Sequence, residues 1–459
     1  MKTNIRRTAQ IVSPIVALTF LLALTSEGGA STFVSGNVSG TWNKAGSPYI
    51  ATGNCTVPGG ESLTIEPGVT VIIGQGLRVD VLGSIFALGS ASERITVRGA
   101  TPSAYWSYIA VYYSGSDSRF QYCNISDATN GVYLGISASD RTMAPELSNC
   151  TFSNCVDACI YGYSAVECGF GYSRLNATIN NCRFYSSSNG VRFTAESCAG
   201  TVSPMIANSL FHGIADTAIW FDVRSGNPDA GQSSPKVLNS VFIQCPAAVR
   251  RGGAANQFSA YTVANCIFSQ CGTAIQRDIN ESEAGGSNVG YNDFYNNQTN
   301  FVGYPAGVHG TICCQNNNGT ACDLLFNIFQ NPNFAETTNY TLSPGSPCID
   351  AGDPSGAYLD SCTNSLGTTV NDIGLYGGPG ACGWIPSTNT SFTLSAGRFV
   401  GVTITPSVPG RYRLEYRPNV DTGVWTQATN VTLLSTPFTW IDFVSPTTEH
   451  RFYRAVLLP

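Results

Sequence analysis

A short phrase returns along this chain at a nearly constant spacing. It begins with Asn and a small residue, and Phe follows three positions after the Asn. The five closest copies occupy residues 149–152, 181–184, 208–211, 239–242 and 265–268. When looser copies on either side are counted, the Phe position recurs every 26 to 35 residues. A period in this range predicts a solenoid, in which each repeat stacks on the next.

Each repeat also contains a second apolar step. An aliphatic residue preceded by a small one comes seven or eight residues after the Phe position. These pairs are Gly131-Val132, Cys159-Ile160, Gly190-Val191, Ala218-Ile219, Ala248-Val249 and Ala274-Ile275. Both apolar runs are short, rich in β-branched and aromatic residues, and bounded by Asn, Gly and Ser, without helical spacing. We therefore predict an all-β chain whose main domain is a parallel β-helix.

The repeated residues have a structural interpretation in such a fold. Each strand pairs with the matching strand one turn away, at roughly 4.8 Å, so equivalent residues form rows. We expect the stacked Phe side chains to fill the interior, and each Asn to bond its own turn and the Asn above it. We assign neither residue a catalytic role.

The 17 cysteines all lie beyond residue 30. Several share a position in the repeat: Cys123, Cys150, Cys182 and Cys266 in one row, and Cys155, Cys245 and Cys271 in another. Stacked cysteines form either disulfides or small buried apolar contacts. Local pairs are better disulfide candidates, namely Cys159 with Cys168, Cys313 or Cys314 with Cys322, and Cys348 with Cys362 or Cys382. The odd total leaves at least one thiol unpaired or intermolecular.

The amino terminus predicts export. Lys2, Arg6 and Arg7 precede an apolar run over residues 11–24, and small residues follow through Ala30. This pattern is typical of a secretory signal peptide, and the alternative, an uncleaved membrane anchor, is disfavoured by the shortness of the run. We expect no membrane span after signal removal, and a secreted, extracellular or cell-surface protein. An oxidising compartment would also permit disulfides.

Composition excludes two classes of partner. The chain is 43% hydrophobic and only 11% charged, with a net charge of -6 and three lysines. Its surface must therefore consist largely of Ser, Thr, Asn, Gln and Gly. Without a basic patch, binding to nucleic acid or to an anionic membrane surface is not expected.

Two segments resemble a known family. Residues 49–99 include Val57-Pro58-Gly59-Gly60-Glu61-Ser62-Leu63-Thr64-Ile65-Glu66-Pro67-Gly68-Val69-Thr70-Val71. This phrase resembles the opening coils of secreted bacterial right-handed parallel β-helix repeat proteins. Ser346-Pro347-Cys348-Ile349-Asp350-Ala351-Gly352-Asp353 and Asp372-Ile373-Gly374-Leu375-Tyr376-Gly377-Gly378 resemble the segment that closes such domains. The resemblance covers about residues 33 to 384 and implies a right-handed solenoid of the pectate-lyase-like architecture.

The composition changes after Cys382, where cysteine disappears and alternating strands such as residues 411–416 begin. The ending, residues 451–459, resembles a small β-sandwich-like module common at the ends of secreted bacterial proteins. A Pro, Ser and Thr cluster at residues 386–390 predicts a linker. We expect a signal peptide over 1–30, a right-handed parallel β-helix over 31–385, and a C-terminal β module over 386–459. Capping or attachment is the favoured role of this module over substrate binding.

The fold leaves two functions open. One is a secreted or cell-surface protein that binds polysaccharide or a cell-envelope component, or has a structural or adhesive role. The other is a polysaccharide-degrading enzyme, a lyase or a glycoside hydrolase, with a groove on one face. Pectate lyases and polygalacturonases share the architecture, but neither a paired Asp-Asp nor a Gly-His-Gly is recognisable here. Their catalytic residues therefore cannot be transferred to this chain.

Alignment of the repeats at Val191, Ile219 and Val249 identifies the candidate site. The residues that follow, Arg192, Trp220 and Arg250, fall in one row, and Glu196 and Arg224 share another, with Asp222 between them. For an enzyme, Glu196, Asp222, Arg224 and Arg250 are the catalytic candidates, because lyases and hydrolases both need acidic groups on one face. Arg192 and Trp220 are the ligand-binding candidates, with the indole as an aromatic platform. The alternative is an ordinary surface ion pair between Glu196 and Arg224, worth about 0 to 1 kcal/mol.

No metal site or cofactor is predicted with a specific motif. The three histidines are scattered, and Cys313-Cys314 lacks zinc-site spacing. An acidic loop with Asp278, Glu281 and Glu283 leaves calcium open, but it lacks the spacing of a calcium loop, which favours a solvated loop.

Overall fold

The computed structural model divides after Pro386 into two compact units. It describes residues 31–115, 117–138, 140–166, 171–197, 199–224, 233–252, 261–277, 287–305, 307–363, 365–383, 400–404, 410–418, 422–433, 438–442 and 452–458. The predicted signal peptide, the predicted linker at 386–390 and the acidic loop with Asp278 lie outside these residues. No helix in the described ranges is long and apolar enough to cross a membrane.

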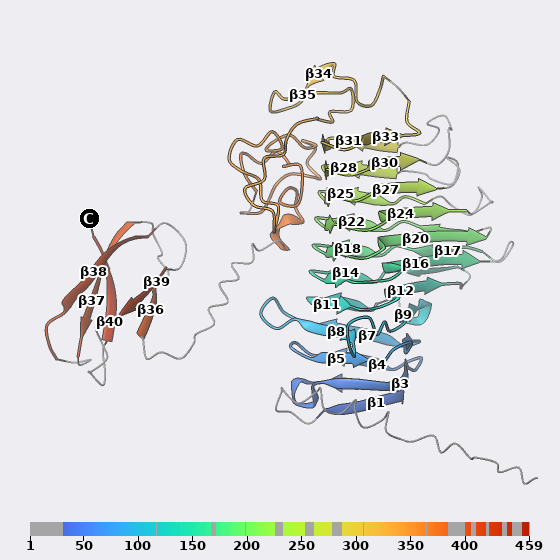
Figure 1. Cartoon of the computed structure of the whole chain (residues 1–459), viewed down its shortest axis with the longest axis horizontal. Coiled ribbons are helices and arrows are strands. Elements are labelled where there is room, and N and C mark those ends of the chain that lie inside the picture. Colours follow the sequence, from blue (N-terminus) through green and yellow to red (C-terminus); the bar gives the residue numbers. More distant parts are fainter. Residues whose placement is uncertain are drawn as a thin grey trace, which may run out of the picture. The chain divides into compact units, whose positions relative to one another are not determined.

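The first unit is a parallel β-solenoid (Figure 1), as the repeats predict. Its strands form three ladders that run along the stack of coils. The first ladder contains β5 (Thr70–Ile73), β8 (Ile95–Gly99), β11 (Cys123–Ser126), β15 (Thr151–Ser153), β19 (Arg183–Tyr185), β23 (Leu210–His212), β26 (Val241–Ile243), β29 (Ile267–Ser269) and β32 (Asp293–Tyr295). The second contains β6 (Val79–Val81), β9 (Ile109–Tyr112), β12 (Asn130–Ile136), β16 (Ala158–Val166), β20 (Asn189–Ser197), β24 (Thr217–Val223), β27 (Ala247–Gly252), β30 (Thr273–Arg277) and β33 (Thr299–Val302). The third contains β2 (Gly40–Trp42), β4 (Ser62–Ile65), β7 (Ser84–Leu88), β10 (Arg119–Gln121), β14 (Glu146–Ser148), β18 (Thr178–Asn180), β22 (Met205–Ala207), β25 (Lys236–Leu238), β28 (Tyr261–Ala264) and β31 (Ser287–Gly290).

Two smaller elements complete the solenoid. At its amino-terminal end, β1 (Thr32–Asn37) pairs with β3 (Tyr49–Val57), which in turn pairs with both β5 and β6. Beside the second ladder, the connections that lengthen three coils form a short sheet of β13 (Arg141–Met143), β17 (Ser173–Leu175) and β21 (Gly200–Val202).

The predicted Phe stack is confirmed. Neighbouring rings among Phe152, Phe184, Phe211, Phe242, Phe268 and Phe294 have centroids 4.5 to 5.3 Å apart and planes within 8° of parallel. These spacings are close to the distance between paired strands, so each ring rests on the ring of the coil before it. The stack fills the core behind the first ladder.

The repeated Asn residues have a structural role in turns, but two of them have different hydrogen-bond partners from those expected. Asn149, Asn181, Asn208, Asn239 and Asn265 all have φ between 44° and 59°. This left-handed conformation turns the chain sharply between the third and first ladders, and Asn tolerates it better than most residues. The side chains of Asn208 and Asn239 hydrogen-bond to a distant segment described below rather than to the neighbouring Asn. The expected Asn-to-Asn chain within the repeats was therefore wrong for these two residues.

The predicted cysteine row is confirmed, but its members form neither disulfides nor purely apolar contacts. Six polar side chains along the row accept a hydrogen bond from the backbone N–H of the equivalent residue one coil earlier. The acceptors include Cys150 Sγ, Ser209 Oγ, Ser240 Oγ, Cys266 Sγ, Asn292 Oδ1 and Asn327 Oδ1, at 3.0 to 3.5 Å. Because a buried N–H at a turn needs a partner, Cys, Ser and Asn can replace one another at this position.

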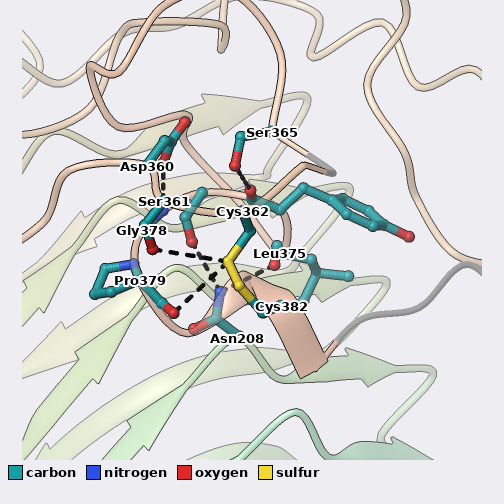
Figure 2. Close-up of a disulfide and its surroundings, with 11 residues drawn as sticks. Asn208, Asp360, Ser361, Cys362, Ser365, Leu375, Gly378, Pro379 and Cys382 are labelled. Atoms are coloured by element: carbon teal, nitrogen blue, oxygen red, sulfur yellow. Dashed lines mark hydrogen bonds between the residues drawn. A yellow bond between two sulfur atoms is a disulfide. The ribbon is translucent and has the colours of Figure 1, made fainter.

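A closing strap, residues 371–383, runs back across the Asn turns. Asn239 donates to Asp372 and Gly374 carbonyls at 3.0 and 3.3 Å, and Asn208 donates to Leu375 and Gly377 carbonyls, both at 2.9 Å. The strap lies so close that a Cβ at Gly380 would come within 2.3 Å of Asn208 Oδ1. Figure 2 shows Asn208 beneath the strap and the Cys362–Cys382 disulfide that closes the strap onto the preceding loop.

The predicted disulfide pairs were wrong in two cases. Cys348 bonds to neither Cys362 nor Cys382, because those two residues bond to each other and Cys348 is a buried thiol beside Asp293. Cys159 is also a buried free thiol, and Cys168 lies outside the described residues. Cys314 and Cys322 are neighbours with free thiols.

The outward face of β23, β26 and β29 is covered by other residues of the first unit. Leu210, Val241 and Ile267 point outward from the first ladder and are buried under Leu342, Ile373 and Leu375 of the closing region. The hairpin of β34 (Cys314–Gln315) and β35 (Ala321–Cys322) belongs to the same region. The solenoid therefore needs no further segment to cover this apolar face.

The second unit is a small antiparallel β module, as the sequence predicts. β37 (Gly410–Arg417) pairs with β38 (Thr426–Leu433) on one side and with β40 (Phe452–Leu457) on the other. β36 (Val400–Ile404) and β39 (Phe438–Asp442) form a separate pair. Glu415 accepts hydrogen bonds from Arg413 and Arg454 at 2.7 Å, which lowers the pKa of this carboxyl.

Candidate functional site

The predicted row of Arg192, Trp220 and Arg250 is present on the second ladder. Strand register pairs Arg192 with Trp220 and Trp220 with Arg250. Because alternate residues of a strand point to opposite faces, these side chains point outward while Val191, Ile219 and Val249 point into the core. Two tyrosines of earlier coils continue the row, since Tyr133 pairs with Tyr161 and Tyr161 pairs with Arg192.

We call Tyr133, Tyr161, Arg192, Trp220 and Arg250 the outer row. They come from β12, β16, β20, β24 and β27, which stack in this order in Figure 1. All five side chains are half-buried, so each keeps part of its surface in solvent. The outer row is thus a straight line of aromatic and cationic groups, one per coil.

Stacking within the outer row determines what it presents to solvent. The Arg192 guanidinium lies 4.3 Å from the Trp220 ring centroid, and the Arg250 guanidinium lies 4.7 Å from it. Since one arginine comes from the coil before Trp220 and the other from the coil after, the two cations cover opposite faces of the indole. Trp220 therefore does not offer the open aromatic platform expected from the sequence. It orients two guanidinium groups, whose planar N–H edges match carboxylate and hydroxyl oxygens.

At the tyrosine end of the row, neighbouring rings meet edge to face. Tyr133 and Tyr161 have centroids 5.5 Å apart with planes at 76°, and Arg192 lies 5.4 Å from the Tyr161 centroid. Tyr133 further contacts Tyr108 and Tyr112 at 6.0 and 6.3 Å. Burial raises the pKa of Tyr133 well above its ordinary value, so its hydroxyl is a neutral donor and acceptor at physiological pH.

Asp222 lies beside the outer row, on the next outward-facing position of β24. Its side chain is only 7% exposed, and Arg224 binds it with Nε 3.0 Å from Oδ1 and Nη2 2.7 Å from Oδ2. Arg192 Nη2 approaches Oδ2 at 3.8 Å. The Asp222 carboxylate raises the pKa of the Arg224 guanidinium through its hydrogen bond and its charge. Asp222 thus connects two of the predicted arginines.

Glu196 joins the same cluster from β20. Its Oε1 lies 3.9 Å from Arg224 Nη1, and its Oε2 accepts a hydrogen bond from the Tyr163 hydroxyl at 3.2 Å. The exposed fractions of the Arg224 and Glu196 side chains are 58% and 40%, which makes their ion pair a weak surface contact. The structure therefore brings Glu196, Asp222, Arg224 and Arg192 together, with Arg250 adjacent through Trp220.

The tyrosines are the part of this face that the sequence reasoning missed. Tyr133 and Tyr161 directly follow Val132 and Ile160, as Arg192 follows Val191, so extending the same alignment by two repeats would have found them. Tyr163 pairs with Thr194, which pairs with Asp222, and forms a second row beside the first. At the amino-terminal end, Tyr112 donates to Asp80 at 3.4 Å.

No group of three or more His, Cys, Asp or Glu residues among those described could hold a metal ion. The cluster contains two carboxylates, Glu196 and Asp222, and two arginines that contact them, Arg224 and Arg192, so its charges are balanced within the protein. The arrangement can donate and accept many hydrogen bonds along one line.

Comparison with known proteins bears on the solenoid alone. Residues 110–276 match the family model described as a right handed beta helix region. This segment is a right-handed β-helix. The matched residues run from β9 to β30 and include the whole outer row, so the candidate site lies on the β-helix itself. A search of curated proteins found no match to the chain.

Proposed function

We propose that this protein is exported and binds polysaccharide along the outer row of its β-helix. The observation that carries the proposal is the register of Tyr133, Tyr161, Arg192, Trp220 and Arg250, one polar aromatic or cationic group per coil. A rigid line of donors and acceptors suits a long, oxygen-rich ligand, because such a ligand can contact several coils without ordering a loop. In a structural or adhesive role at a cell surface, the same donors and acceptors of the outer row would contact the surface component.

Export is supported by chemistry as well as by the predicted signal peptide. The Cys362–Cys382 disulfide persists in oxidising compartments and is rare in the reducing cytosol. The low charge of the chain also fits a ligand that is recognised through hydroxyl and carboxylate oxygens rather than through a basic patch.

The test measures binding of the mature protein to a panel of neutral and uronate polysaccharides, with and without calcium. Affinity electrophoresis is the readout. Substitution of Arg192→Ala together with Arg250→Ala removes two oriented guanidinium groups. Since a hydrogen bond to a charged group contributes roughly 1.5–3 kcal/mol and 1.4 kcal/mol is tenfold in Kd, we expect binding to weaken by at least tenfold.

Arg119→Ala is the matched control, because Arg119 is an exposed arginine on β10 of the third ladder, paired only at the surface with Glu146. It should leave binding unchanged. Equal binding by the wild type and the double variant would contradict the proposal, as would an equal loss in Arg119→Ala.

A second candidate, polysaccharide cleavage, is favoured by the cluster of Glu196 and Asp222 beside the outer row. The same incubations are therefore examined for unsaturated products and new reducing ends. Cleavage that is lost in Asp222→Asn and Glu196→Gln would replace the binding proposal by an enzymatic one.

A further inference from the structure

Three cysteines meet at the hairpin of β34 and β35. Cys314 and Cys322 are directly opposite each other in its antiparallel pair, and their sulfur atoms are 3.4 Å apart. The sulfur of Cys313 lies 3.8 Å from that of Cys314. Cys322 is buried, Cys314 is half-buried and Cys313 is exposed.

We propose that Cys314 and Cys322 form a disulfide that closes this hairpin, and that Cys313 remains as an exposed thiol. Opposed residues of an antiparallel pair have Cα atoms about 4.5–5.5 Å apart, which lies within the range that a disulfide spans. Closure therefore requires side-chain rotation and no backbone movement. Cys314 Sγ now points to the Asp323 carbonyl oxygen at 2.9 Å, a contact that the rotation would release.

Strand geometry selects Cys314 over Cys313. Successive side chains of a strand point to opposite faces of the sheet, so only Cys314, directly opposite Cys322, has its side chain on the same face as Cys322. The backbone N–H of Cys313 donates to the Cys322 carbonyl at 3.0 Å, while its side chain lies in solvent. The stacked cysteines inside the β-helix differ, since Cys150 and its neighbours Cys123 and Cys182 are all buried, whereas the partly exposed Cys314 can meet an oxidant before it pairs with Cys322.

The oxidation is thiol–disulfide exchange with oxidised glutathione. One cysteine thiolate attacks a glutathione sulfur, which forms a mixed disulfide and releases one reduced glutathione. The second cysteine then attacks the mixed disulfide, releases the second reduced glutathione and forms the Cys314–Cys322 bond; the two protein thiol protons end on the two released glutathione thiols. Burial and Cys314 together raise the pKa of Cys322 to about 12, which makes Cys322 a poor leaving thiol. Attack by Cys313 on the Cys314 sulfur, which would expel Cys322, is therefore disfavoured.

The bond would fix the end of the β-helix. Asp323, which follows Cys322, accepts from the backbone N–H groups of Leu325 and Asn327, both at 2.9 Å, and from Gly310 at 2.9 Å. Asn327 in turn accepts from the Asn292 N–H at 3.0 Å, in the last steps of the acceptor row. The disulfide would thus hold Cys314 to the strand that leads directly into the segment that ends this row.

In the test, the full chain is incubated with oxidised glutathione. The remaining thiols are alkylated first under native conditions and then after unfolding, and the products are identified by peptide mapping. We expect a 314–322 cross-link in the wild type and in Cys313→Ser, and none in Cys314→Ser or Cys322→Ser. Among the cysteines that the structure describes, Cys313 should be alkylated rapidly under native conditions, and Cys313→Ser should lose this site.

Two outcomes would overturn the proposal. One is a cross-link that persists in Cys314→Ser and so joins Cys313 to Cys322. The other is a wild-type protein in which both Cys314 and Cys322 remain alkylatable after unfolding. The melting temperature of each variant, measured in reductant, shows that every variant is folded before oxidation.

Discussion

At one position of the repeat, residues of different chemical class make the same contact, a hydrogen bond from a backbone N–H to a side-chain acceptor. Ser209, Ser240, Cys266 and Asn292 occupy equivalent positions, and each offers a side-chain acceptor to the N–H of the equivalent residue one coil earlier. A hydrophobic residue of the same size would leave that N–H unsatisfied, at a cost of about 1–3 kcal/mol. The contact explains why cysteine recurs in the repeat without forming disulfides there.

Asp293 is a carboxyl in the core whose pKa is changed by burial. It is completely buried, its Oδ1 accepts from the Gln330 N–H at 3.1 Å, and its Oδ2 lies 3.4 Å from Cys348 Sγ. Burial raises the pKa of Asp293 to about 7. Asp372 and Asp360, in the closing region, have pKa values raised by burial to about 7 and about 6.

The first prediction concerns stability and pH. A carboxyl whose pKa is raised in the folded state stabilises the fold when protonated, and this contribution is lost as pH rises through the folded pKa. We expect the melting temperature to fall between about pH 4 and pH 8. Asp293→Asn keeps the side chain neutral at every pH, so the melting temperature of the variant should fall less. At 1.36 kcal/mol per pKa unit, Asp293 contributes at most about 4 kcal/mol to the pH dependence of the free energy of unfolding. Thermal unfolding across this range tests it, and equal pH slopes in wild type and variant would refute it.

The sequence identifies residues 372–378 as part of a closing segment by resemblance, but not the coils that this closing strap contacts. Residues 371–383 contact Asn turns more than 130 residues earlier in the chain, and one end is held by the Cys362–Cys382 disulfide. Gly380 and Gly383 lie against Asn208 and Asn181 where a Cβ would clash. The strap therefore links the last part of the unit to coils in its middle.

The second prediction concerns this strap. Removal of the disulfide in Cys362→Ser/Cys382→Ser frees a loop of about 20 residues and should cost roughly 3 kcal/mol of stability by the chain-entropy account. Hydrogen exchange should increase in residues 371–383 and change little in β16 and β20. Reductant should lower the melting temperature of the wild type more than that of the double variant, which lacks the Cys362–Cys382 bond. A reductant effect of equal size in both proteins would assign the stabilisation to another bond.

Periodicity and register were predictable from the sequence because each repeat carries its own copy of the pattern. Val132, Ile160 and Val191 predict where the coils align, and that alignment placed Arg192, Trp220 and Arg250 in one row. Contacts between distant segments carry no such pattern. The strap, the pairing of Cys362 with Cys382 and the stacking of two arginines on Trp220 depend on three-dimensional packing that no repeat encodes.

The faces of the whole solenoid differ in what covers them. The outward residues Leu210, Val241 and Ile267 of the first ladder are buried by the closing region, and the Asn turns are covered by the strap. The outer row on the second ladder keeps partial exposure over five coils. This difference makes the second ladder the face on which a long ligand is expected.

The most direct test of this account is hydrogen exchange of the mature protein with and without the polysaccharide that it retains most strongly. Binding along the outer row predicts reduced exchange in β12, β16, β20, β24 and β27, in successive coils, and unchanged exchange in β14, β18, β22 and β25 of the third ladder. Protection confined to the third ladder or to the C-terminal module, or a protein that retains none of the polysaccharides, would contradict it.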